Sequence, residues 1–217
     1  FVICDKNEEA LKTAKELGLA SNYTSDPVEV ARLCDIIFIC TPVRSMAQVA
    51  QALKPGLKPG TIITDVGSVK SYVVKSAAPH IPDNCHFIPG HPVAGLETAG
   101  PENGFPALFD NRNWILTPPE GSDKAAIKIL RDLLEKLNIK NVIEMDPDTH
   151  DRALGFTSHM PHVIAFAAML ESAEISEDLG IDISQFNGGS YEDMTRVSTA
   201  NTIMWQDIFL TNADNVK

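Results

Sequence analysis

The first two thirds of the chain alternate between short apolar runs and segments with helical periodicity. The runs DIIFICT at 35–41 and TIITD at 61–65 are apolar almost throughout, whereas residues 8–17 and 123–137 place apolar side chains at helical spacing. Strands that are apolar on both faces, separated by helices, are typical of a parallel sheet with helices on both sides. The pattern therefore predicts a doubly wound, Rossmann-type α/β domain.

The pattern changes at Asp146-Pro147, where a capping residue and a proline at the first helical position predict the start of a helix. Beyond it the periodicity is helical only, with a long helix to about residue 177 and shorter helices near 189–200 and 202–213. We therefore expect a dinucleotide-binding domain at 1–146 and a helical domain at 147–217. The long helix is too apolar to stand alone in water, so we expect it to pack against the sheet domain or a second subunit.

Composition and charge argue against several classes of partner. The formal net charge is -11 at pH 7, and complexes with nucleic acid or anionic membranes need a concentrated basic face. No apolar run reaches the length of a membrane-crossing helix, and the first residues lack the features of a secretory signal. Four cysteines without CxxC spacing, in strand-like runs, favour buried, reduced thiols and a cytoplasmic location.

An acidic residue ends the first predicted strand. Asp5 closes the run VICD. An acid at the carboxyl end of the second strand of a dinucleotide fold accepts hydrogen bonds from the adenosine ribose and repels a 2′-phosphate, which predicts NAD as the cofactor. The alternative is an ordinary turn residue. The sequence contains no GxGxxG, so the predicted domain has its first strand and phosphate loop missing, unless it binds no nucleotide at all.

Two further segments follow predicted strands, at the edge where an open parallel sheet binds its ligand. They are CTPV at 40–43 and DVGSVK at 65–70. In the second, Gly67 permits a tight turn and Ser68 is placed to contact nicotinamide or substrate, although a turn with a capping serine has the same pattern. The residues assigned to cofactor binding are Asp5, Cys40, Thr41, Pro42, Val66, Gly67 and Ser68.

The segment GHPVAGLETAG at 90–100 contains the best candidate for a general base. His91 lies between Gly90 and Pro92 at the end of a strand, where the backbone is held rigidly. A neutral imidazole can take the proton of an alcohol while a hydride leaves the same carbon, as a dehydrogenase requires. The alternative is a solvated histidine in a loop.

Polar residues interrupt the long apolar helix in the motif TSHMPH. Ser158 and His162 are four residues apart and share a helix face, and Pro161 should kink the helix beside them. Polar groups beside a kink predict a pocket wall. The alternative is a zinc site that draws on His91, His150, His159 and His162. No pair of ligands has a spacing such as HExxH, so we expect no metal.

An arginine stands out in the acidic carboxyl-terminal part. Arg196 lies in the segment GGSYEDMTRVSTANTIMWQDI at 188–208. The planar fork of an arginine binds carboxylates bidentately, which suggests a clamp for an anionic substrate. The alternative is an ion pair on a helix surface with Glu192 or Asp193.

Four segments, in this order, resemble the prephenate/arogenate (cyclohexadienyl) dehydrogenase family along essentially the whole chain. They are DVGSVK, GHPVAG, HDRALGFTSHMPH and GGSYEDMTRVSTANTIMWQDIFLTN. The resemblance implies NAD-dependent oxidative decarboxylation of prephenate to 4-hydroxyphenylpyruvate, of arogenate to tyrosine, or of both, in tyrosine biosynthesis. It also implies a homodimer formed through the helical domain, with further helices after Lys217.

The resemblance also implies roles for individual residues. His91 corresponds to the catalytic histidine, which hydrogen-bonds the ring hydroxyl, and Ser68 to the serine that supports it beside the nicotinamide. Arg196 corresponds to the arginine that binds the ring carboxylate. The other substrate-binding positions are His162 and Ser158, near the substrate side chain, and Glu97, in the gating region.

Two other functions are consistent with parts of the sequence. A β-hydroxyacid dehydrogenase combines the same two types of domain, but that class uses a lysine on the long helix as its acid and base, and residues 147–177 contain no lysine. A non-catalytic, NAD-responsive module would explain the missing glycine loop. It would have little reason to keep His91 together with Arg196.

Overall fold

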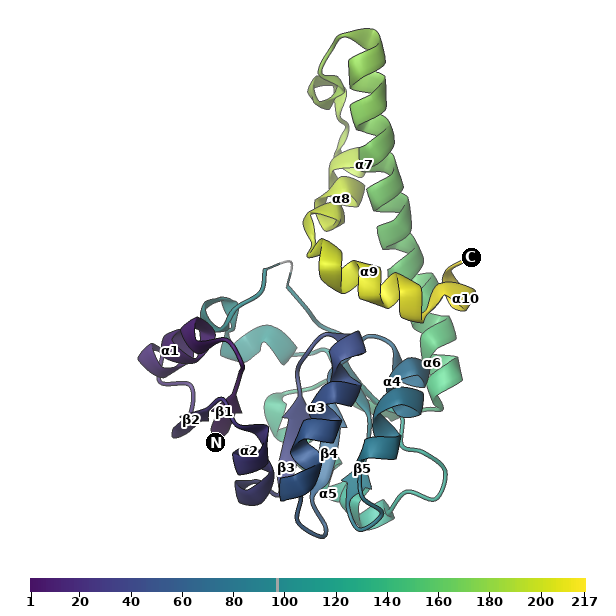
Figure 1. Cartoon of the computed structure of the whole chain (residues 1–217). Helices are drawn as coiled ribbons and strands as arrows, with labels where there is room; N and C mark the ends of the chain where they lie inside the picture. Colours follow the sequence, from purple (N-terminus) through teal and green to yellow (C-terminus); the bar gives the residue numbers. More distant parts are fainter. Residues whose placement is uncertain (97) are drawn as a thin grey trace.

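A computed structural model describes residues 1–96 and 98–217 of the chain (Figure 1). The strands are β1 (Val2–Cys4), β2 (Asn22–Thr24), β3 (Ile36–Ile39), β4 (Ile62–Asp65), β5 (His86–Phe87), β6 (Gly90–Pro92), β7 (Asn113–Leu116) and β8 (Asn141–Glu144). The α-helices are α1 (Glu8–Glu16), α2 (Pro27–Leu33), α3 (Met46–Leu53), α4 (Lys70–Ala77), α5 (Lys124–Leu134), α6 (Pro147–Leu154), α7 (Met160–Leu179), α8 (Gly189–Arg196), α9 (Thr202–Thr211) and α10 (Ala213–Val216). Strands and α-helices alternate from β1 to β5, β6 follows β5 directly, α5 lies between β7 and β8, and only helices follow residue 144.

The strands form three hydrogen-bonded groups. β1 pairs with β2 in parallel, β3, β4 and β5 form a parallel group in that order, and β7 pairs in parallel with β8. In the strand order of dinucleotide-binding folds, 3-2-1-4-5-6, β2 and β1 take positions 3 and 2, and β3, β4 and β5 take positions 4, 5 and 6. The predicted parallel α/β domain is confirmed. One pairing, β6 with β7, is antiparallel, and the three-residue strand Gly-His-Pro has no periodicity from which to predict it.

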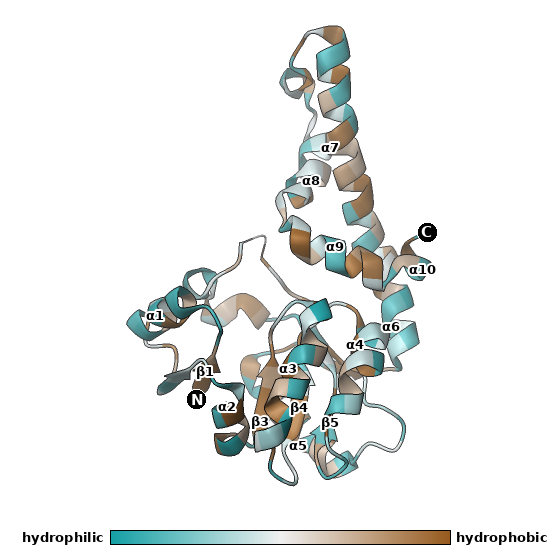
Figure 2. Ribbon diagram, viewed as in Figure 1, coloured by the Kyte–Doolittle hydropathy of each residue, from teal (hydrophilic) through white to brown (hydrophobic). Residues whose placement is uncertain are grey.

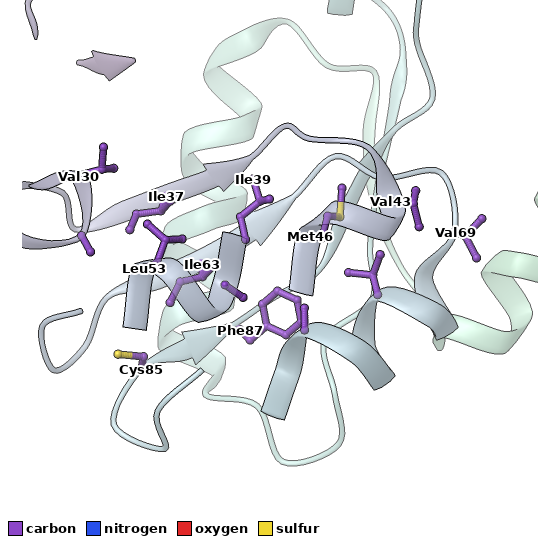
Figure 3. Close-up of a cluster of buried hydrophobic side chains, with 14 of the residues drawn as sticks. Val30, Ile37, Ile39, Val43, Met46, Leu53, Ile63, Val69, Cys85 and Phe87 are labelled. Carbon is purple, nitrogen blue, oxygen red and sulfur yellow. The ribbon is translucent and has the colours of Figure 1, made fainter. Parts of the chain in front are cut away.

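Helices cover both faces of the central strands, as the continuous apolar runs predicted. In β3, Ile37 and Ile39 join a cluster with α2, α3 and α4, whereas Ile36 and Phe38 pack against a second cluster around α5. Figure 3 shows the first cluster, in which Met46 and other helix side chains meet the strands. Each buried aliphatic side chain of this kind contributes about 1.5–3 kcal/mol. The sheet is therefore a rigid platform for the loops that follow its strands.

The helical part begins where the sequence predicted it. The Asp146 side chain accepts the Thr149 N–H at 2.8 Å, and Pro147 is the first helical residue of α6. A π-helical turn at Gly155–His159 joins α6 to α7. Pro161 has no N–H to donate, and the expected kink takes the form of this π turn, a feature that often marks functional sites. In Figure 1, α7 projects away from the sheet domain, and α8 and α9 return beside it.

The long helix leaves many apolar side chains uncovered. The helix from Pro147 to Leu179 is long and apolar enough to cross a membrane by length and composition alone, with a mean hydropathy of 1.3 in a window that is 22% buried. The expectation that no segment reaches this length is therefore wrong, because it counted only uninterrupted apolar runs. Figure 2 shows apolar positions, in brown, along α7 and α9. The exposed apolar side chains of these two helices include Ile164, Leu170, Leu179, Ile203 and Leu210, and Phe156 in the π turn is exposed too.

The cysteines differ from the expectation of four buried thiols. All four are free, as expected, but only Cys85 is buried, whereas Cys4 and Cys40 are exposed. Cys4 ends β1 and Cys40 follows β3, so both lie at strand ends that the helices do not cover.

Candidate active site

Close packing of β6 against β4 positions His91. The Gly90 N–H donates to Asp65 Oδ1 at 3.1 Å, and a Cβ atom at position 90 would lie 2.8 Å from Trp114 Nε1 and 3.0 Å from the Asp65 carbonyl oxygen. Only glycine therefore allows this approach. His91, the next residue, is 8% exposed, so the alternative of a solvated loop histidine is wrong.

A buried ion pair lies directly behind His91. The side chains of Lys70, the first residue of α4, and Asp65, the last residue of β4, are both 0% exposed and form an ion pair. Lys70 Nζ also donates to the Gly90 carbonyl oxygen at 2.6 Å, and Asp65 Oδ2 accepts the Gly67 N–H at 2.8 Å. Burial lowers the pKa of Lys70, while Asp65 acts in the opposite direction. The pair ties β4, the start of α4 and β6 together next to the imidazole.

His91 is the end of a chain of three hydrogen-bonded side chains that joins the sheet part to α6. His91 Nδ1 lies 2.8 Å from His150 Nε2, and His150 Nδ1 lies 2.8 Å from Asp151 Oδ1. The Asp151 carboxylate also accepts the N–H groups of Lys70 at 2.6 Å and Ser71 at 2.8 Å. Asp151 thus caps α4 from another helix. The alternative of a capping Ser68 is wrong, since the cap position of α4 is Val69 and makes no side-chain bond.

The surroundings hold the His91 imidazole neutral. Burial lowers the pKa of His91 well below its usual value, and a positive charge on any of its neighbours His150, Lys70 and His159 acts in the same direction. Burial would raise the pKa of Asp151, but hydrogen bonds from His150, Lys70 and Ser71 outweigh it and lower that pKa. At neutral pH the site therefore contains a neutral imidazole connected to an ionised carboxylate, which suits a general base.

The polar groups of the long helix have different surroundings. His159 is buried, its Nδ1 lies 3.0 Å from Asn212 Nδ2, and burial lowers its pKa to about 4. His162 stacks on Trp205 with ring centroids 3.5 Å apart, and its Nδ1 lies 2.9 Å from the Ser158 carbonyl oxygen. Trp205 belongs to the buried cluster of the sheet domain. His162 and Ser158 are partly buried at the place where α9 docks on that domain, whereas His159 is buried within the structure.

The predicted cofactor residues all follow strands at the same edge of the sheet. Asp5 follows β1, Cys40, Thr41 and Pro42 follow β3, and Val66, Gly67 and Ser68 follow β4. Among the described residues, no partner accepts or donates a hydrogen bond at the buried Thr41 hydroxyl. The exposed Asp5 carboxylate accepts the Asn7 N–H at 2.8 Å through one oxygen, so it also shapes a turn. An exposed carboxylate and an unpaired hydroxyl at this edge fit a dinucleotide.

Three other predictions concern Arg196, Glu97 and the absence of a metal. Arg196 ends α8 and is exposed. Glu97 lies outside the described residues. A search of those residues finds no group of three or more histidine, cysteine or acidic side chains that could hold a metal ion.

Four residues around His91 were not assigned a role from the sequence. Asp65 and Lys70 flank the turn of DVGSVK, and two opposite charges five residues apart around a buried turn were a usable signal. His150 was considered only as a metal ligand in the zinc alternative, and Asp151 was assigned no role. Their neighbours in the first turns of a capped helix gave no indication that they are buried.

Comparison with known proteins gives consistent matches along the chain. Residues 1–143 match the family model "Prephenate dehydrogenase, nucleotide-binding domain", and residues 146–217 match "Prephenate dehydrogenase, dimerization domain". The chain is 37% identical over 209 residues to cyclohexadienyl dehydrogenase of Zymomonas mobilis and 32% identical over 213 residues to prephenate dehydrogenase of Bacillus subtilis. These matches cover 96% and 98% of this chain, but 71% and 57% of the two relatives.

A solved structure agrees with the sequence comparisons. The crystal structure of prephenate dehydrogenase from A. aeolicus in complex with hydroxyphenyl propionate and NAD+ has a TM-score of 0.90 and 32% identity. That match covers 99% of this chain and 74% of the other. Both domains are thus similar to those of one enzyme type. The chain therefore belongs to the prephenate/cyclohexadienyl dehydrogenase family, soluble NAD-dependent oxidoreductases of tyrosine biosynthesis, and contains the family's nucleotide-binding and dimerization domains.

Proposed function

We propose that the protein oxidises and decarboxylates prephenate, arogenate or both, with NAD as the hydride acceptor and His91 as the general base. The observation that carries the assignment of the base is a buried, neutral imidazole on β6, beside the strand ends where a dinucleotide binds. NAD bound at these strand ends would supply the hydride acceptor for the ring carbon that bears the hydroxyl group. His91 takes the hydroxyl proton as that carbon becomes a ketone. The bond to the ring carboxylate then breaks, carbon dioxide leaves, and the electron pair passes through the ring to the ketone oxygen, which takes the proton back from His91 as the ring becomes aromatic.

The substrate contacts belong to the same proposal. Arg196 binds the ring carboxylate, because a guanidinium fork holds a carboxylate by two hydrogen bonds. His162 and Ser158 lie near the substrate side chain, and Glu97 belongs to the gating region. Ser68, partly buried one turn from Lys70, supports the base beside the nicotinamide. These residues position the substrate, and positioning supplies much of the rate of such a reaction since aromatisation drives the loss of carbon dioxide.

The cofactor contacts follow from the strand ends. Asp5 binds the hydroxyl groups of the adenosine ribose, and its charge disfavours a 2′-phosphate, so NAD is preferred over NADP. Thr41, with Cys40 and Pro42, and the turn Val66–Ser68 line the rest of the cofactor. A Cβ atom at Gly67 would lie 2.9 Å from Met46 Cε and 3.0 Å from Asp65 Oδ2, so a larger residue here would have to displace these side chains.

We further propose that residues 1–146 and 147–217 are the two domains of a cytoplasmic homodimer. A second copy of the helical domain covers the exposed apolar side chains of α7 and α9, such as Leu170 and Ile203, which are 70% and 68% exposed. The match of this region to a dimerization domain supports a second copy of the chain, rather than a lipid bilayer, as the surface that covers these side chains. Nucleic acid is excluded by the net charge of -11.

Substitution of His91 tests the proposed function. We expect full-length enzyme to reduce NAD when prephenate or arogenate is added. The reaction is measured by the absorbance of the reduced cofactor. His91→Asn should lower kcat by on the order of 100-fold or more and leave the Kd for NAD nearly unchanged. His86→Asn, a partly buried imidazole on β5, is the matched control. Near-normal turnover of His91→Asn would refute the assignment of the base.

Substitution of Arg196 tests the clamp independently of the base. Because hydrogen bonds to charged groups contribute about 1.5–3 kcal/mol, Arg196→Ala should raise KM by roughly 10- to 100-fold. The exposed Arg112 offers a control, Arg112→Ala, that removes the same charge elsewhere. An unchanged KM in Arg196→Ala would remove Arg196 from the substrate site.

A further inference from the structure

We propose that His150 and Asp151 are positioning residues that hold the His91 proton on Nδ1 and then share the proton that Nε2 takes from the substrate. This inference rests on the proposed function of His91 as the base. It concerns the two residues that connect the sheet domain to α6, for which the sequence suggested no catalytic part. Among His91, His150 and Asp151, the Asp151 carboxylate is the group whose protonation is fixed by its backbone contacts.

Asp151 must accept hydrogen bonds at both oxygens. Its Oδ1 receives the Lys70 N–H at 2.6 Å and its Oδ2 receives the Ser71 N–H at 2.8 Å. These amides begin α4, so the positive end of that helix also favours the ionised carboxylate. His150 Nδ1 lies 2.8 Å from the same Oδ1. Since an ionised carboxylate cannot donate, the proton in this contact belongs to His150 Nδ1.

The remaining protons follow in order. A neutral His150 with its proton on Nδ1 has a lone pair at Nε2. His91 Nδ1 lies 2.8 Å from this nitrogen and must donate to it, so His91 Nδ1 carries the proton. His91 Nε2 is then left with its lone pair, the form needed to accept a hydroxyl proton. The carboxylate thus fixes the tautomer of the base through two rings.

The neighbouring charges favour movement of the accepted proton away from His91. When the substrate O–H bond breaks and an Nε2–H bond forms, His91 becomes a cation next to Lys70, whose ammonium group bonds the carbonyl oxygen of Gly90. The Nδ1 proton can then pass to His150 Nε2. The charge then lies beside the Asp151 carboxylate, and the same protons return when Nε2 gives its proton back to the phenolate oxygen that the loss of carbon dioxide leaves.

No other charged group described around His91 and His150 can balance the positive charge of the accepted proton. Asp65 faces Lys70 and is already paired with it. Burial lowers the pKa of His159, on the π turn, to about 4, so this ring is neutral at pH 7 and offers no negative charge to a protonated His91. His150 and Asp151 are 0% and 1% exposed, so water does not screen the contact. Asp151 is therefore the carboxylate placed to balance the new charge.

The tautomer can be read directly by NMR. In full-length enzyme labelled with 15N in the histidine rings, with and without NAD, we expect His91 to show a protonated Nδ1 and an unprotonated Nε2. In Asp151→Asn, an amide N–H replaces one acceptor and the pattern of His91 should invert or become mixed. A wild-type spectrum with the His91 proton on Nε2 would overturn the proposal. This measurement does not depend on turnover, so it stands even if the substrate is neither prephenate nor arogenate.

Kinetics separate the two parts of the proposal. Asp151→Asn should lower kcat by on the order of 10²- to 10⁴-fold with little change in KM, as a wrong tautomer does in other bases held by a carboxylate. His150→Gln keeps an acceptor for the His91 Nδ1–H but cannot take up a proton. It should keep the wild-type tautomer, lose roughly 10-fold in kcat, and move the acid limb of the kcat/KM profile to lower pH.

Controls distinguish these effects from damage to the fold. His86→Gln should leave kcat, the pH profile and the spectrum of His91 unchanged. Thermal unfolding and the Kd for NAD identify variants that fail to fold. If Asp151→Asn does not fold, the kinetics of His150→Gln and the His91 tautomer in the wild-type spectrum test the proposal. Wild-type kcat and pH profile in both His150→Gln and Asp151→Asn, with an active wild-type enzyme, would refute the inference and leave the proposed function standing. An inactive wild-type enzyme with the expected tautomer would refute the proposed function instead.

Discussion

Replacement of Lys70 by methionine tests whether the buried ion pair fixes the strand that carries His91. Methionine retains the approximate length and the apolar stem of lysine but removes the ammonium group, which pairs with Asp65 and donates to the Gly90 carbonyl oxygen at 2.6 Å. Both side chains of the pair are 0% exposed. Lys70→Met therefore leaves a carboxylate buried without its cation and a carbonyl oxygen without its donor.

The magnitude follows from the contacts that remain. Removal of one partner of a buried pair usually costs about 3–5 kcal/mol. Asp65 retains the N–H groups of Gly67 and Gly90, at 2.8 and 3.1 Å, so we expect the lower end, about 3 kcal/mol. In a chain of this length that corresponds to a fall in Tm of roughly 6–12 °C.

The assay is urea unfolding, followed by circular dichroism and by tryptophan fluorescence. Trp114 lies in the sheet part and Trp205 in α9, so the fluorescence reports on both regions. Lys128→Met is the matched control, because Lys128 pairs with Asp132 on the surface and the two side chains are 72% and 51% exposed. Such a pair contributes at most about 1 kcal/mol.

A double-mutant cycle with Asp65→Asn then isolates the ion pair. The double variant should be more stable than the sum of the two single losses predicts, by about 2 kcal/mol, since no buried charge is left unpaired. A loss of less than about 1 kcal/mol in Lys70→Met, equal to that of Lys128→Met, would refute the reasoning. So would strict additivity with Asp65→Asn, because the two groups would then not stabilise each other.

Three further predictions concern the cofactor, the pH dependence and the assembly. Asp5→Ser should raise kcat/KM with NADP relative to NAD by about 10-fold, and an unchanged ratio would show that Asp5 is only a turn residue. The folded chain holds the pKa of His159 at about 4, so below the ordinary histidine pKa the unfolded chain binds more protons than the folded chain. The free energy of unfolding should therefore fall by up to about 2 kcal/mol from pH 7 to pH 5. In urea unfolding, His159→Phe should make the free energy of unfolding depend less on pH. Leu170→Glu should convert dimer to monomer in sedimentation, whereas Ile129→Glu, on an exposed face of α5, should not; equal masses would exclude α7 from the interface.

Most of the fold could be predicted because local signals and burial agree. Asp26-Pro27 and Asp146-Pro147 cap helices in the structure as they do in the sequence pattern. Apolar runs such as Ile36–Ile39 become strands whose alternate residues enter two different clusters. The antiparallel pairing of β6 with β7 could not be predicted, since β6 has only three residues and its partner Trp114–Leu116 lies far along the chain. Pairing at such separation leaves no periodic pattern.

The candidate site was predictable only in part, for a similar reason. His91 could be chosen because its neighbours Gly90 and Pro92 restrict the backbone. His150 and Asp151 could not, because polar residues in the first turns of a capped helix are usually solvated, and here both are buried. Their burial results from α6 packing against α4, a contact between the two predicted domains. A sequence pattern describes each helix alone and does not contain that contact.

The charges around His91 give the buried Lys70 a role beside the proposed base. The described side chains of the buried network carry one cation, Lys70, and two carboxylates, Asp65 and Asp151, while the pKa of His91 lies well below its usual value and the ring is neutral. With both imidazoles neutral, as the proposed tautomers require, the network is one charge short of neutrality until the pair of imidazoles takes up a proton. Because Lys70 is paired with Asp65, the remaining negative charge lies at Asp151, on the far side of His150 from His91. In these surroundings the imidazole is neutral before the reaction, and the Asp151 carboxylate balances the positive charge after the imidazole pair accepts a proton.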